Sequence, residues 1–201
     1  MRTFLLLCCL GTGCALVSKA QPLAPRYFSP EAASSRAGGV PPDAPSAPAL
    51  ELRLGQIDAA VHLEERIAYR PSPGELGYYE SWRWTEPPQA YLRRALAREL
   101  FERRGLTRVV SGNAPTLSVE LTSFEEVREG KPSARVELAV LLRGERRALL
   151  ERTLRQERPL PSDAGEDPRI LTQALALALD AAVSEVADRV SARLAELPRE
   201  P

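Results

Sequence analysis

The sequence has very little of the chemistry on which most enzymes depend. His62 is its one histidine, and none of its three cysteines lies beyond Cys14. Without thiol pairs, the rest of the chain can form neither a disulfide framework nor a cysteine metal site. It also has no Gly-x-Ser-x-Gly elbow, phosphate-binding loop or dinucleotide glycine pattern. These absences predict a protein that is not an enzyme and that uses no metal and no cofactor.

The residues that could still act chemically have simpler interpretations. His62 lies in an alternating stretch at the edge of a predicted strand, which favours a structural role. Glu125, Glu126 and Glu129 fall at a strand end beside a predicted hairpin, so we interpret them as a solvated turn rather than a carboxylate pair. Glutamates interleave with the basic face of a predicted helix, which is typical of a solvated face. The basic residues of that face are Arg93, Arg94, Arg98, Arg103 and Arg104.

Neither positive nor negative charge is in excess. Lysine and arginine together number 27, and aspartate and glutamate also number 27. A nucleic-acid-binding domain would show a basic excess. The sequence therefore predicts no nucleic-acid partner.

The first residues have the pattern of a secretion signal. Arg2 is followed by an apolar run from Phe4 to Leu10, as in the charged and hydrophobic regions of a signal peptide. The run is too short for a membrane span, which needs about 20 apolar residues. We therefore expect export to the cell envelope.

Two cleavage sites compete behind this signal. In the favoured interpretation, Leu10-Gly11-Thr12-Gly13-Cys14 is a lipobox, and the chain is cut before Cys14. Cys14 would then carry a diacylglycerol on its sulfur and an acyl chain on its new amino group. In the alternative, Ser18-Lys19-Ala20 is an ordinary small-x-small site, and the cut falls before Gln21. The sequence does not decide between them.

The remaining chain divides into a linker and a domain. Residues 1–13 are the predicted signal peptide, and residues 14–48 are the lipidated N-terminus and a tether rich in proline, alanine and serine. The aromatic pair Tyr27-Phe28 interrupts this tether and could dock as a short edge strand. Residues 49–198 are predicted to form one domain.

The periodicity within that domain predicts an α+β fold. Alternating residues indicate strands at 50–57, 65–70, 75–84, 116–127, 133–143 and 146–156, and a short buried strand at 107–111. The last three long strands read as an antiparallel meander. One helix is predicted to be capped by Thr85 and to end at Gly105, and a second begins at Asp167-Pro168 and runs for about 30 residues. We expect a single, mostly antiparallel sheet with both helices packed on it.

Four aromatic residues gather in one predicted strand. Tyr78, Tyr79, Trp82 and Trp84 include both tryptophans of the chain. Alternation places Tyr79 on the opposite face from the other three. Core packing is the favoured role for two of the four rings. Any ring left exposed would suit a partner-binding surface, where tyrosine and tryptophan are enriched.

These aromatic residues open a stretch that resembles a known family. At residues 78–100, YYESWRWTEPPQAYLRRALAREL, the chain is similar to the ABC-type transport auxiliary lipoprotein component, the group that includes the intermembrane transport lipoprotein PqiC. That family has a lipoprotein signal, an early aromatic pair as at Tyr27-Phe28, a leucine-alternating first strand as at Leu50–Leu54, and a Trp-[Ala/Thr]-Glu-Pro segment that leads into a helix. Trp84-Thr85-Glu86-Pro87 matches the last element. Gly11 in the lipobox and the long tether depart from the pattern.

The resemblance implies a non-enzymatic subunit of a transport machine. Such a subunit works beside a mammalian-cell-entry (MCE) domain protein and an ABC transporter, which move phospholipids or other apolar molecules between the inner and outer membranes. We expect a docking subunit at the periplasmic face of the outer membrane, anchored through Cys14 and labelled by palmitate. Ala15 favours the outer membrane over the inner one.

The sequence leaves two alternative functions open. The domain could be a periplasmic carrier whose sheet–helix cleft binds a lipid. It could also be a structural lipoprotein of the envelope without a transporter partner. The sequence does not say whether the protein forms a homo-oligomer.

Overall fold

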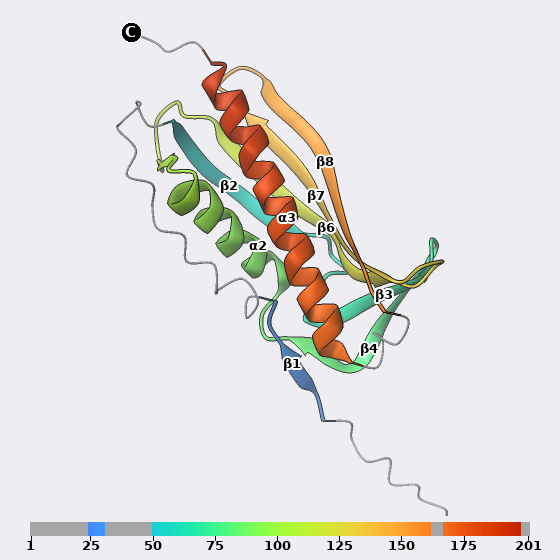
Figure 1. Ribbon diagram of the computed structural model, residues 1–201. Helices are drawn as coiled ribbons and strands as arrows, with labels where there is room; N and C mark the ends of the chain where they lie inside the picture. Colours follow the sequence, from blue (N-terminus) through green and yellow to red (C-terminus); the bar gives the residue numbers. More distant parts are fainter. Residues whose placement is uncertain (1–23, 31–49, 162–166, 198–201) are drawn as a thin grey trace, which may run out of the picture.

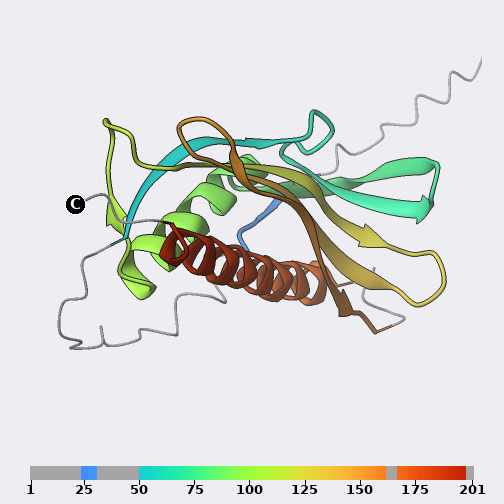
Figure 2. The same ribbon diagram turned by 90° about the horizontal axis from the view of Figure 1, so that it is seen from above.

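A single sheet covered on one face by helices makes up the described part of the chain (Figures 1 and 2). The computed structural model describes residues 24–30, 50–161 and 167–197. The predicted signal peptide, Cys14 and both predicted cleavage sites lie outside these residues. In chain order the elements are β1 (Arg26–Phe28), β2 (Glu51–Ala59), β3 (Arg66–Ser72), β4 (Glu75–Trp84), α2 (Pro88–Ala97), the π-helical turn η1 (Arg98–Arg103), β5 (Thr107–Arg108), β6 (Thr116–Val127), β7 (Ser133–Arg143), β8 (Ala148–Pro159) and α3 (Pro168–Ala195).

Strand β6 is the centre of the sheet. It pairs along its whole length with β7, and β7 in turn pairs with β8, all antiparallel, which confirms the predicted meander. On its other side β6 pairs with β2 over its first half and with β3 at its end, both parallel. Beyond β3 lie β4 and then β1, whereas β5 lies beyond β2.

The α+β class is confirmed, but the sheet is mixed rather than mostly antiparallel. The β2–β6, β3–β6, β2–β5 and β1–β4 pairs are all parallel. The connection between β2 and β6 explains the parallel pairing of these two strands. The β3–β4 hairpin, α2 and η1 return the chain to the end of the sheet where β2 began, so β6 runs in the same direction as β2. Alternation in a sequence identifies a half-buried strand but not the direction of its neighbour.

Helix α3 covers the sheet with almost its whole length. Asp167 caps it by accepting a hydrogen bond from the Arg169 backbone N–H at 2.9 Å, and Pro168 opens its first turn, as predicted. Its 28 residues are long and apolar enough to cross a membrane. However, 56% of its most apolar window is buried inside the fold, where α3 packs against β7, β8 and α2. The prediction that this helix covers the sheet is confirmed.

The first helix starts differently from the prediction, but its helical course ends before Gly105 as predicted. Its N-cap is Pro87, and the Thr85 hydroxyl instead forms a hydrogen bond with the Tyr91 hydroxyl at 2.7 Å. Pro88 at the first helical position has no N–H to satisfy, and the Ala90 N–H bonds to the Pro87 carbonyl at 2.9 Å. The helix continues into η1, in which Glu99 is buried. Gly105 follows with φ of 67°, as suits a glycine behind a helix end.

Two short strands end the two branches of the sheet that lie on the side of β6 opposite β7. β1 pairs in parallel with β4, with Tyr27 opposite Arg83, as the aromatic pair had suggested for a docked edge strand. β5 is shorter than predicted, and both of its residues are exposed rather than buried. It lies at the outer edge beyond β2, where only one neighbour covers it.

Candidate functional site

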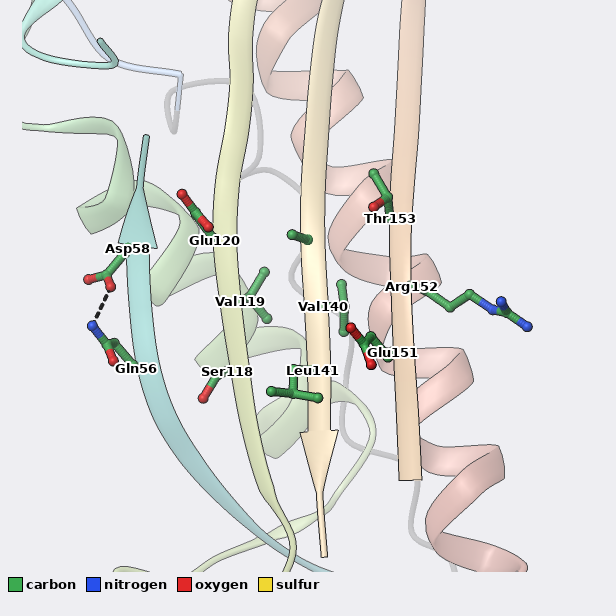
Figure 3. A pocket seen from close by; sticks show the side chains of 11 residues that line it. Gln56, Asp58, Ser118, Val119, Glu120, Val140, Leu141, Glu151, Arg152 and Thr153 are labelled. Carbon is green, nitrogen blue, oxygen red and sulfur yellow. Dashed lines mark hydrogen bonds between the residues drawn. The ribbon is translucent and has the colours of Figure 1, made fainter. Parts of the chain in front are cut away.

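A hollow of about 630 Å³ lies on the face of the sheet that the helices leave open (Figure 3). Strands β2, β6, β7 and β8 form its walls and floor. Small or half-buried side chains, among them Ser118, Ala139 and Leu141, lie in its middle. Longer polar side chains surround them, namely Gln56, Asp58, Glu120, Glu151, Arg152 and Thr153.

Hydrogen-bonding and charged side chains line most of this hollow. Gln56 donates a hydrogen bond to Asp58 at 2.5 Å, so part of the wall is held in place (Figure 3). Arg152 lies on β8, on the other side of the hollow, and points away from it in this view. The hollow therefore presents hydrogen-bonding groups and carboxylates to whatever approaches this face. None of the side chains that line it is a cysteine or a histidine.

The opposite face of the sheet is closed by packing. Leu52, Leu92, Leu96, Leu138 and Leu175 are all fully buried between the sheet and the helices. Side chains thus fill the space in which a bound lipid chain would have to lie. Among the described residues, no group of histidine, cysteine, aspartate and glutamate is arranged to hold a metal ion.

The aromatic strand places its two tryptophans in the core. Trp84 is 1% exposed, and its ring lies 5.0 Å from Phe124 and 6.1 Å from Tyr91 between ring centroids. Trp82 is also buried, and Phe28 of β1 packs against it edge-on. Both tryptophans therefore belong to the packing of β4 and offer little surface to a partner.

The two tyrosines of this strand remain half-buried. Tyr79 stacks on Trp82 at 3.7 Å, so the two rings lie on the same side of β4, contrary to the alternation expected. An irregularity in the β3–β4 pairing, between the pairs Arg66–Arg83 and Ala68–Tyr78, inserts extra residues in β4 and changes the alternation. The Tyr78 hydroxyl donates to the His62 carbonyl at 2.9 Å. Partner binding by the aromatic strand stays a prediction.

Glu125 and Glu126 are buried, so their interpretation as a solvated turn was wrong. Glu125 accepts hydrogen bonds from Arg70 at 2.8 Å and 3.2 Å and from the Ser123 hydroxyl at 3.1 Å. It is 1% exposed, and Arg70 reaches it because β3 lies beside the end of β6. Sequence reasoning missed this pair, since nothing local to Glu125 shows that an arginine 55 positions earlier will lie next to it.

Glu126 lies in a second buried cluster on the other side of the strand. It accepts hydrogen bonds from Arg128 Nε at 2.8 Å and from the Tyr79 hydroxyl at 2.5 Å. The guanidinium of Arg128 lies 3.8 Å from the centroid of the Tyr69 ring, a cation–π contact. The two clusters join β3, β4 and β6 at one end of the sheet. Glu129, beyond them, is exposed as predicted.

Alkaline titration should reveal the Tyr79–Glu126 contact. Burial, and then the hydrogen bond to Glu126, raise the pKa of Tyr79 well above its ordinary value. The pKa of Tyr79 is about 10 in the unfolded chain and higher in the folded protein. The contribution of Tyr79 to the unfolding free energy is therefore fully present below pH 10 and is lost as the pH rises through the folded pKa. We expect the unfolding free energy of Tyr79→Phe to fall less steeply above about pH 10 than that of the wild type. Urea unfolding at several alkaline pH values measures this, with Tyr27→Phe as the exposed control. Equal slopes for the wild type and Tyr79→Phe would contradict the assignment.

The basic face of the first helix is largely neutralised by neighbouring acids. Arg94 pairs with Glu86 at 2.7 Å, and Arg103 pairs with Glu99 at 2.9 Å. Arg104 contacts both Glu99 and Asp188, so it also joins η1 to α3. The interleaved charges therefore act as ion pairs within the fold.

The fold and the hollow together describe a small α+β domain with a solid core and an open polar face. The pattern of the ABC-type transport auxiliary lipoprotein component matches residues 34–191, and the chain belongs to this family. The resemblance seen in the sequence is thereby confirmed. None of the curated proteins matches the chain in sequence.

Solved structures share this fold. Protein XCC0632 from Xanthomonas campestris is 23% identical with a TM-score of 0.62, and the match covers 71% of this chain and 84% of that one. An uncharacterized protein is 18% identical with a TM-score of 0.60, over 70% and 91% of the two chains. The hypothetical protein CT253 from Chlamydia trachomatis is 10% identical with a TM-score of 0.50, over 73% and 98%. At these identities the likeness concerns the fold alone.

Proposed function

We propose that this protein is a docking subunit that an acyl anchor holds in the outer membrane, on its periplasmic face. In this role it serves an ABC transport system with an MCE-domain protein, which moves phospholipids or other apolar molecules between the two membranes. Membership of the transport auxiliary lipoprotein family is the observation that carries the proposal. The polar open face agrees with it, because a surface that presents hydrogen-bonding groups suits contact with a protein.

A docking role is favoured over that of a lipid carrier by the packing of the core. A carrier would need an apolar cavity between sheet and helices, and leucines with no exposed surface occupy that space. The hollow on the other face is open and lined by polar groups. Native mass spectrometry of the purified full chain distinguishes the two roles. We expect no co-purified phospholipid, and a stoichiometric lipid adduct would favour the carrier.

We also propose that the protein has no catalytic activity of its own. The side-chain nitrogen Nε2 of His62 is buried, and no other described residue forms a hydrogen bond with it. A catalytic histidine needs a nucleophile or a carboxylate within hydrogen-bonding reach. Within the described part of the chain, Nε2 of His62 thus lacks the contact that would make it a general base, and the transport role needs none.

The anchor is tested at Cys14. Replacing Cys14 by alanine removes the only thiol at which the favoured cleavage site could be acylated. We expect wild-type cells grown with labelled palmitate to yield a labelled protein in the membrane fraction, and Cys14→Ala to yield an unlabelled one. Cys9→Ala is the matched control and should keep the label. A soluble, unlabelled wild-type protein that begins at Gln21 would contradict the anchor.

The transport role is tested by capture of the partners. The full chain, tagged at its C-terminus and cross-linked in membranes of its own cells, should recover an MCE-domain protein and an ABC transporter subunit. The Cys14→Ala variant should recover less of both, because it is no longer held at the membrane. Recovery of neither subunit from wild-type membranes would contradict the proposal.

A further inference from the structure

Strand β8 forms an outer edge of the sheet, and the outward backbone groups of its middle residues have no partner among the described residues. It pairs only with β7 among the described residues and lies outermost on its side of the sheet (Figure 1). Natural sheets usually shield such an edge, because its free N–H and C=O groups can pair with another strand. The backbone itself is protected only at the two ends, and the middle carries exposed charged side chains, which admit only a strand with complementary charges. At one end Arg193 donates to the Leu149 carbonyl at 2.9 Å, and at the other Pro159 has no N–H.

The direction of the free backbone groups follows from two contacts. The Leu160 N–H bonds to the Pro132 carbonyl next to β7, whereas the Leu149 carbonyl points away and meets Arg193. Backbone groups alternate in direction along an antiparallel strand. The β7–β8 pairing is regular from Leu150 onward, so the odd-numbered residues direct their N–H and C=O groups outward. Those without a partner in the described ranges belong to residues 151, 153, 155 and 157.

The side chains of the same residues lie on the open face of the sheet and carry a charge pattern. Arg155 pairs with Glu137 at 2.7 Å, and Glu157 pairs with Arg135 at 2.7 Å, both across to β7. Glu151 has no ion pair within the described part of the chain and is exposed. The edge therefore presents one unpaired acid two residues before Thr153 and one base two residues after it.

We propose that β8 is the pairing edge for a second copy of this chain, in antiparallel register about a two-fold axis at Thr153. In that register Thr153 lies opposite the same residue of the second copy. Glu151 of each copy then lies opposite Arg155 of the other, so two opposite-charge pairs form across the axis. The free backbone groups of residues 151, 153 and 155 bond to each other, and the result is one sheet that continues through both copies.

Neighbouring registers are less favourable. A two-fold axis at Leu154 would set Glu151 against Glu157, and an axis at Arg155 would set that arginine against itself. Like charges directly opposite each other destabilise a strand pair. An axis at Gln156 would leave Glu151 unpaired and would require an N–H from Pro159. With the axis at Thr153, opposite charges face each other and every outward backbone group near the axis has a hydrogen-bond partner. Because Glu151 and Thr153 also border the hollow, the hollows of the two copies would lie side by side across the axis.

A single introduced cysteine tests this register. In the full chain with Cys8, Cys9 and Cys14 replaced by serine, Thr153→Cys supplies the only thiol. Directly opposite residues in a hydrogen-bonded pair lie about 5.5 Å apart between Cα atoms, within the range that a disulfide bridges. We expect rapid formation of a disulfide-linked dimer under mild oxidation. Two control variants should cross-link far more slowly. Glu157→Cys lies on the same edge, but in this register it is eight residues away from the position opposite its copy. Leu177→Cys is exposed on α3, away from the edge.

Charge reversal supplies the second measurement. Adding Glu151→Arg to Thr153→Cys turns two attractive pairs into two repulsive ones, and we expect the rate of dimer formation to fall about tenfold. Glu145→Arg makes the same change of charge in the β7–β8 turn and should leave the rate unchanged. The proposal is overturned if Thr153→Cys cross-links no faster than Glu157→Cys. It is also overturned if Glu151→Arg has no more effect than Glu145→Arg.

Discussion

Replacing Arg70 by methionine is expected to lower the free energy of unfolding by about 3 kcal/mol. The guanidinium donates two hydrogen bonds to Glu125, whose side chain is almost completely buried. Without Arg70 the carboxylate keeps only the Ser123 hydroxyl as a partner and remains away from water. A buried charge that loses its counter-ion costs far more than an exposed pair that is broken. Urea unfolding followed by circular dichroism measures the difference.

Two variants separate this explanation from a general effect of losing an arginine. Arg135→Met breaks the exposed Arg135–Glu157 pair, and we expect it to cost less than about 1 kcal/mol. Arg70→Met combined with Glu125→Leu removes both charges, and it should recover most of the stability lost by Arg70→Met alone. If the double variant is less stable than the single one, the buried carboxylate is not the cause of the loss.

Replacing Trp84 by alanine should have an effect at least as large, about 3–5 kcal/mol. The indole contacts Phe124 and Tyr91 and lies within the main hydrophobic cluster. Its removal leaves a cavity between β4, β6 and α2 that the neighbouring side chains can fill only in part. Thermal and urea unfolding should both show the loss.

The same substitution decides between a core role and a partner-binding role for this residue. Tyr27→Ala removes an exposed ring of the edge strand β1, and we expect it to change the unfolding free energy by less than about 0.5 kcal/mol. If Trp84→Ala were as stable as the wild type but failed to capture the transporter subunits, Trp84 would be a contact residue. We expect instead that Trp84→Ala lowers the unfolding free energy, and that any loss of partner capture follows from the loss of stability.

The parts of the fold that could be predicted are those that local patterns specify. The meander follows from strict alternation and short turns, since strands joined by short turns pair antiparallel. Helix α3 follows from its apolar spacing together with the Asp167-Pro168 start. The aromatic pair at Tyr27-Phe28 sufficed to suggest a docked edge strand.

Features that depend on distant parts of the chain could not be predicted. The parallel pairing of β2 with β6 depends on where the β3–β4 hairpin and α2 return the chain. Burial of Glu125 depends on Arg70, and the position of Tyr79 on the face of Trp82 depends on an irregularity in β4. In each case the local pattern is compatible with two outcomes, and the contact with a distant strand selects one.

The candidate site was missed for a related reason. Alternation identifies the residues of β6, β7 and β8 that face away from the helices, but it does not show that this face is hollowed. The hollow forms where small side chains such as Ser118 and Ala139 lie between longer polar ones on neighbouring strands. Their proximity depends on the register of four strands, which the sequence does not reveal. The sequence instead led us to predict partner binding by the aromatic strand β4, and most of the surface of its two tryptophans lies in the core.

Photo-cross-linking in living cells tests the central claim most directly. A benzophenone amino acid in place of the exposed Glu120, on the open face, should cross-link to an MCE-domain protein or an ABC transporter subunit. The cross-link should disappear in cells that lack the transporter, and the same group in place of Leu177 on α3 should give less of it. Cross-links confined to unrelated envelope proteins, or unchanged without the transporter, would contradict the account.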